Sequence, residues 1–152
     1  MIFIIASFVV PVLVYFFLPA LIKRYAGKEP VSRLPLLVGG LLFLISWYIP
    51  SFDIRGQYTA FTTHFLGGIY AGFIWLYIIS QLHWRPPLFL GLIGLFFLVS
   101  GLGIANELFE LGVTELKIVN LDPSDTWWDL LANTLGVLLF WVGYNFYSLL
   151  RK

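Results

Sequence analysis

Long apolar runs alternate with short polar breaks along this chain, and such runs occur five times. The breaks between them are charged or rich in proline and glycine, residues that interrupt helices. Each run has about the 20 residues that an α-helix needs to cross a bilayer. The pattern therefore predicts an all-α fold: a polytopic integral membrane helical bundle with one domain over residues 1–152 and five transmembrane helices, over about residues 2–22, 34–52, 58–82, 88–111 and 127–150.

The overall composition agrees with a membrane protein and excludes several function classes. Hydrophobic residues make up 60% of the chain and charged residues 11%, whereas a soluble domain is about half apolar and a quarter charged. The net charge of +1 argues against nucleic acid as a partner. Cysteine is absent from the sequence, which excludes disulfides, thiolate metal sites and cysteine nucleophiles.

The distribution of charge predicts the direction of the helices. Seven of the nine Lys and Arg residues fall on one side of the predicted bundle, and Arg55 and Lys117 fall on the other. Because cytoplasmic loops carry the excess of basic residues, the N-terminus is expected outside and the C-terminus in the cytoplasm. Seven of the eight acidic residues then lie at or near the outer face, and Glu29 is the exception.

Polar and small residues share helix faces in three of the predicted spans. In the third span His64, Gly68 and Gly72 recur at intervals of four, and the two glycines form a GxxxG pattern. Small residues at this spacing let another helix approach closely, so His64 is expected to face protein rather than lipid. Corresponding stripes in the last two spans contain Ser100, Gly103, Glu107 and Glu110, and then Asp125, Asp129, Asn133, Gly136 and Gly143.

These polar groups are expected to meet in one pocket that opens to the outside. With a rise of about 1.5 Å per residue, His64 and Asn133 lie at similar depth below the outer ends of their spans. A charged group costs roughly 2.5–3.5 kcal/mol at the centre of a membrane helix, so such residues usually face a bundle interior and mark a functional site. All three spans place these residues at the same end, and this agreement favours a functional cluster.

Simpler structural interpretations of single residues stay open at this point. Thr126 and Asp129 fit a T-x-x-D capping box, in which Asp129 only stabilises a helix N-terminus. Asn133 could be an interhelical hydrogen-bonding residue worth roughly 0.6–2 kcal/mol. His64 alone is more often a structural hydrogen-bonding group than a ligand. The segment VTELKIV, residues 113–119, alternates in polarity and is expected to be strand-like or re-entrant.

The run DLLANTLG, with Asp129, Asn133 and Gly136, resembles the final-helix motif of the VanZ-like membrane proteins. His64 and the pair Glu107 and Glu110 match the early histidine and the later glutamate of that family in order and approximate spacing. The combination of ELFE with DTWWD is also similar to the YjdF-like inner-membrane proteins. The resemblance covers about residues 55–145 and implies a multi-pass protein of a prokaryotic plasma membrane, associated with the cell envelope. It implies no defined reaction.

The leading hypothesis is a protein that acts on or binds an envelope lipid or a lipid-linked headgroup. In it Glu107, Glu110 and Asp129 hold a hard divalent cation such as Mg²⁺, which binds phosphate. Alternatively, a carboxyl group pairs with His64 for acid–base chemistry. His64, Glu107 and Asp129 are the candidate catalytic residues, and the candidate ligand-binding residues are Glu110, Asp125 and Asn133.

Two further functions remain alternatives. A proton- or cation-coupled transporter would use the Asp, Glu and His residues as a relay. A structural or regulatory membrane protein would use the same cluster only to lock helix packing, and removing one buried partner would then destabilise the fold.

Overall fold

The computed structural model describes residues 2–27, 32–54, 57–118 and 126–150, and in these ranges the chain is almost entirely helical. In chain order the elements are α1 (Ile2–Ala26), α2 (Leu34–Ile45), the 3-10 helix η1 (Ser46–Tyr48), β1 (Asp53–Ile54), β2 (Gln57–Tyr58), α3 (Phe61–Gln81), α4 (Leu88–Glu115) and α5 (Thr126–Leu150). The prediction of a helical fold is confirmed over the described residues. The two short strands are the departure from it, and they form a small antiparallel hairpin.

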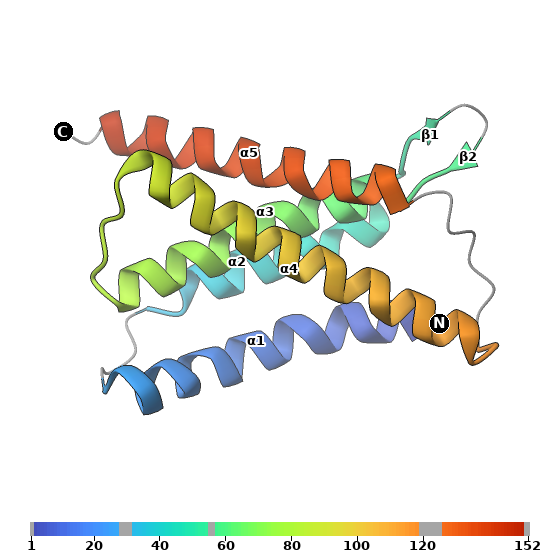
Figure 1. Ribbon diagram of the computed structural model, residues 1–152, viewed down its shortest axis with the longest axis horizontal. Helices are drawn as coiled ribbons and strands as arrows, with labels where there is room; N and C mark the ends of the chain where they lie inside the picture. Colours follow the sequence, from blue (N-terminus) through green and yellow to red (C-terminus); the bar gives the residue numbers. More distant parts are fainter. Residues whose placement is uncertain (1, 28–31, 55–56, 119–125, 151–152) are drawn as a thin grey trace.

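Successive helices run in alternating directions and form a bundle (Figure 1). α3 contacts α2, α4 and α5, whereas α1 contacts α2 along the outside of the bundle. Four of the described helices, α1, α3, α4 and α5, are long and apolar enough to cross a membrane. The chain is therefore a multi-pass membrane protein by the length and composition of its helices.

The second predicted span, residues 34–52, is shorter in the structure than the sequence pattern indicates. α2 ends at Ile45, and η1 extends helical backbone only to Tyr48. Ile49 is extended, with φ −96° and ψ 125°, and it precedes Pro50. A residue before proline is disfavoured in the α conformation, which explains why the helix stops here although the apolar run continues to Phe52.

The segment VTELKIV is not strand-like over its described residues. α4 continues through Glu115, beyond the predicted boundary at residue 111, and ends in a Schellman motif. Lys117 has φ 56°, and the amide of Ile118 donates to the carbonyl of Val113. The amide of Lys117 donates to the carbonyl of Thr114, so the last carbonyl groups of the helix are satisfied.

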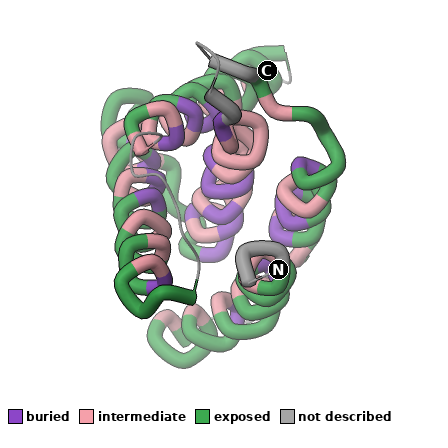
Figure 2. Tube along the Cα trace, turned by 90° about the vertical axis from the view of Figure 1, so that its right-hand side faces the viewer, coloured by how far each residue is buried: buried purple, intermediate pink, exposed green. Residues whose placement is uncertain are grey.

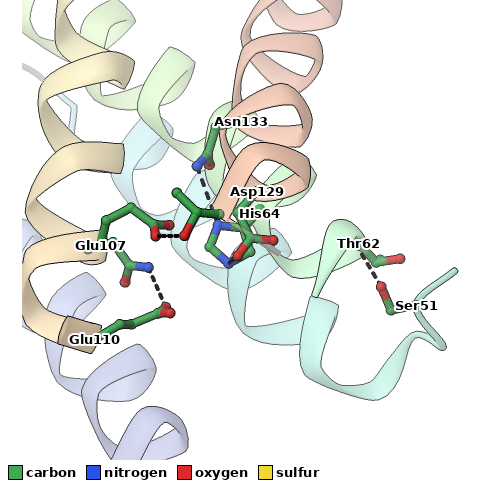
Figure 3. Close-up of polar contacts among 9 residues, drawn as sticks. Ser51, Thr62, His64, Glu107, Glu110, Asp129 and Asn133 are labelled. Atoms are coloured by element: carbon green, nitrogen blue, oxygen red, sulfur yellow. Dashed lines mark hydrogen bonds and ion pairs between the residues drawn. The ribbon is translucent and has the colours of Figure 1, made fainter. Parts of the chain in front are cut away.

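The hairpin is tied to the beginning of α3 by side-chain hydrogen bonds. The Thr59 hydroxyl donates to the carbonyl of Phe52 over 2.8 Å. The backbone amide of Thr62 donates to the Ser51 hydroxyl over 3.2 Å (Figure 3), and the Thr62 hydroxyl donates to the carbonyl of Pro50. These bonds fix the path of the chain immediately before the turn of α3 that carries His64.

Buried residues lie on the inward sides of the helices, and the outward sides are exposed (Figure 2). One apolar cluster, with Leu36 and Tyr70, packs between α2 and α3. A second, with Leu95 and Val137, joins α3, α4 and α5. The exposed apolar side chains of the outer faces suit contact with lipid, because lipid tails are as apolar as leucine.

Candidate functional site

The site is built where α3 and α5 cross with their backbones in contact. A Cβ atom added to Gly68 would clash with the carbonyl oxygen of Asn133, and one added to Gly136 would clash with that of Phe65. Each helix therefore presents a glycine to the backbone of the other. The predicted close approach at Gly68 is confirmed, and it brings the first turns of α3 and α5 together.

His64 lies between two residues of α5 that are one helical turn apart (Figure 3). Its Nδ1 is 3.3 Å from the amide nitrogen of Asn133, and its Nε2 is 3.2 Å from Oδ2 of Asp129. Because an amide N–H can only donate, Nδ1 accepts the hydrogen bond and the imidazole proton is placed on Nε2, facing the carboxylate. The His64 side chain is 13% exposed and that of Asp129 2%.

α4 brings two further carboxylates to the same place. The Thr126 hydroxyl, in the first turn of α5, donates to Oε2 of Glu107 over 2.8 Å. The Asn106 amide donates to Oε1 of Glu110 over 2.7 Å, within α4 itself. Both glutamates are partly buried. Figure 3 shows their side chains extending from the neighbouring helix toward His64 and Asp129.

Carboxylate oxygens of Glu107, Glu110 and Asp129 lie within 4.8 Å of one another. At this separation two carboxylates repel by about 3.5 kcal/mol for an effective dielectric constant of 20. Two ligands of one cation can be at most twice the metal–oxygen distance apart, about 4.6–5.2 Å for Ca²⁺ and about 4.0–4.2 Å for Mg²⁺. The 4.8 Å bound is within this two-ligand limit for Ca²⁺, whose longer bonds would need less movement of the three oxygens than those of Mg²⁺.

The structure brings five of the six sequence-predicted residues together: His64, Glu107, Glu110, Asp129 and Asn133. Asp125, the sixth, lies outside the described residues. The predicted span over residues 88–111 places Glu110 one residue before its end, whereas α4 continues for five residues after Glu110.

The capping interpretation of Thr126 and Asp129 does not account for their contacts. Thr126 is the first residue of α5, its hydroxyl donates to Glu107, and Asp129 pairs with His64. Sequence reasoning missed both this role of Thr126 and the support of Glu110 by Asn106. The spacing of four residues between Asn106 and Glu110 was a usable signal, since such residues are neighbours on a helix surface.

A comparison with protein-family models, curated proteins and solved structures finds no match for this chain. The resemblance to VanZ-like and YjdF-like proteins therefore stays a prediction, and the function has to be argued from the residues of the cluster.

Proposed function

We propose that this protein crosses the membrane five times and binds a divalent cation with Glu107, Glu110 and Asp129, and through the cation the phosphate-bearing headgroup of a membrane lipid. The observation that carries the proposal is the convergence of three carboxylates from two membrane helices within 4.8 Å. A bound dication turns their mutual repulsion into attraction. Its hard character matches an all-oxygen set of ligands.

Three carboxylates leave a bound cation with open positions. Ca²⁺ takes six to eight oxygen ligands and Mg²⁺ takes six. The remaining positions are available to water and to phosphate oxygens, which Mg²⁺ in particular commonly binds alongside one or two carboxylates. A lipid headgroup is the phosphate carrier that can reach a site between membrane helices directly from the bilayer.

The role we propose for His64 is to position Asp129 rather than to ligate the cation. Both of its ring nitrogens are engaged, one by Asn133 and the other by Asp129. Carboxylate ligands of metals are usually oriented by hydrogen bonds of this kind, and removal of such a partner typically costs 10–100-fold in metal affinity. Thr126 would orient Glu107 in the same way.

The fifth crossing and the direction of the chain belong to this proposal. α2 and η1 together span residues 34–48, and the extended residues that follow would complete the crossing. The alternating directions of the five helices in Figure 1 support an odd number of crossings. Lys23, Arg24, Arg33 and Arg85 lie in or beside connections at the end of the bundle opposite the cluster, which supports a cluster facing outward in a prokaryotic plasma membrane.

The test is thermal unfolding of the detergent-purified protein with Mg²⁺, Ca²⁺, Mn²⁺ or Zn²⁺. A cation at a hundred-fold excess over its Kd stabilises the folded state by about 2.7 kcal/mol. We expect a rise in Tm for the wild type and its loss in Glu107→Gln. Glu115→Gln removes the same charge from an exposed position of the same helix and should respond like the wild type.

No shift with any cation in wild-type protein would overturn the cation proposal. A shift that persists in a folded Glu107→Gln protein would place the cation elsewhere. If Glu107→Gln does not fold, Glu110→Gln makes the same test, because the Glu110 hydrogen bond to Asn106 lies within one helix. Loss of folding in both variants, with no cation effect on the wild type, would favour a purely structural cluster.

A further inference from the structure

A groove between α4 and α5 leads from the middle of the bundle toward the carboxylate cluster. Its wider part has a volume of about 560 Å³ and is lined by Leu92, Phe96 and Leu138 among others. A second hollow of about 240 Å³ continues it, since Phe96 and Thr134 line both. Phe97, at the edge of the wider part, is 69% exposed, so the groove opens toward the lipid.

The lining of the wider part is apolar even where the sequence has a hydroxyl. Thr134 donates its hydroxyl to the carbonyl of Leu130 over 2.8 Å, within its own helix. The remaining residues of this part are aliphatic or phenylalanine. Such a lining offers no hydrogen bond to a polar ligand and suits a hydrocarbon chain.

The narrow part ends at the polar cluster. Asn133 lines this hollow, and its amide nitrogen contacts His64. Ile104, which lines it from α4, precedes Glu107 by one helical turn. Asn133 is thus shared between an apolar groove and the site that we propose to bind a phosphate headgroup.

The length of the groove matches one leaflet of a bilayer. On α4 the lining runs from Leu92 to Ile104, which corresponds to about 18 Å at a rise of about 1.5 Å per residue. The hydrocarbon core of a bilayer is about 30 Å thick, so a leaflet contributes about 15 Å. A lipid whose headgroup lies at the cluster would have an acyl chain of suitable reach along the groove.

We infer that the groove between α4 and α5 holds one acyl chain of a phospholipid whose phosphate lies at the carboxylate cluster. This inference rests on the proposed function for the place of the headgroup and identifies the ligand as a lipid taken laterally from the outer leaflet. The groove supplies apolar contact to the chain, and the cation supplies the attachment of the phosphate.

The experiment uses purified protein in detergent and phosphatidylglycerol with a photoreactive diazirine in its acyl chain. After irradiation, mass spectrometry compares labelling of residues 92–97 and 134–138 with labelling of Phe16 and Phe17, exposed on α1. We expect several-fold stronger labelling in the groove, saturating with probe concentration, whereas labelling of α1 rises in proportion to the probe. Equal, unsaturable labelling of both regions would overturn the inference.

A matched pair of variants makes the test specific. Leu138→Trp fills the groove and should lower its labelling several-fold, whereas Leu139→Trp adds the same bulk at an exposed position outside the lining. Unchanged labelling in a folded Leu138→Trp protein would contradict an acyl chain in the groove. Glu107→Gln separates the two proposals. Groove labelling that falls together with the cation effect supports a phosphate attached through the cation, whereas labelling that survives would keep the acyl chain in the groove and contradict that attachment. Labelling without any cation effect in the wild type would overturn the proposed function and the place of the headgroup, but not the acyl chain in the groove.

Discussion

At the scale of single residues, the contact between Asn133 and His64 tests whether a fixed orientation of the imidazole ring supports cation binding at Asp129. Asn133→Ala removes the donor to Nδ1, so the imidazole is no longer oriented toward Asp129. An interhelical hydrogen bond in a membrane contributes about 0.6–1.7 kcal/mol. We expect a loss of stability of this size and a fall in cation affinity of about 10–100-fold, measured by denaturant titration in detergent and by cation-dependent Tm.

Asn145→Ala is the matched control for that variant. Asn145 lies on the same helix, but its amide donates to the carbonyl of Trp141 in its own helix. Its removal should leave the response to cations unchanged. Equal losses of cation affinity in both variants would show that the Asn133 side chain affects the site through α5 as a whole rather than through its contact with His64.

The residues that form the cluster could be predicted from sequence because they break the apolar pattern of their helices. His64, Glu107, Glu110, Asp129 and Asn133 are strongly polar groups in predicted spans that are otherwise mostly apolar. Thr126, the partner of Glu107, could not be found in this way. Threonine is common at helix ends, and only the relative rotation of α4 and α5 shows that the Thr126 hydroxyl reaches Glu107.

At the scale of helices, the reciprocal glycine contacts predict a sharp difference between positions. Gly136→Ala forces a methyl group against the carbonyl of Phe65, and overpacking of this kind costs about 1–3 kcal/mol. We expect lower stability and, because α5 must move away from α3, a weaker cation response. Thermal unfolding in detergent with and without Ca²⁺ measures both.

Gly143→Ala is the control on the same helix. A methyl group added there meets no atom within 4 Å. Alanine also favours helix over glycine by up to about 1 kcal/mol, so this variant should be as stable as the wild type or slightly more so. Destabilisation by Gly143→Ala equal to that by Gly136→Ala would contradict the assignment of close packing to one face.

The C-terminal ends of α2 and α4 were the least predictable parts of the fold, for two different reasons. The stop of α2 before Pro50 follows a local rule that the apolar run obscured. The end of α4 uses Lys117 in the left-handed conformation, with φ 56°. Glycine normally marks such a position, so the sequence carried no sign of this cap.

At the scale of the whole molecule, the proposed orientation can be tested with single cysteines, because the sequence contains none. Ser32→Cys lies in the connection between α1 and α2, and Leu116→Cys lies just after α4, at the other end of the bundle. In intact bacterial cells, a membrane-impermeant maleimide should label Leu116→Cys. It should label Ser32→Cys only after the cells are permeabilised.

Labelling of both cysteines from outside would contradict the five-crossing topology, and labelling of Ser32→Cys alone would reverse it.

The five apolar runs of the sequence were sufficient to predict the order of the helices and that they form a bundle. The run over residues 34–52 could not indicate how much of itself would be helical, because hydropathy measures suitability for lipid and not backbone conformation.

The bond between His64 and Asn133 joins residues 69 positions apart, and this separation has a consequence for biosynthesis. α3 and α4 leave the ribosome before α5 does, so His64, Glu107 and Glu110 enter the membrane before Asp129 and Asn133 do. During that interval the glycine face of α3 lacks the helix that packs against it. The polar groups of α3 and α4 lack their partners on α5. A quality-control protease that recognises unpaired polar groups in the membrane would therefore recognise this chain as incomplete until α5 is inserted. Premature termination before Thr126 should yield a chain that is rapidly degraded.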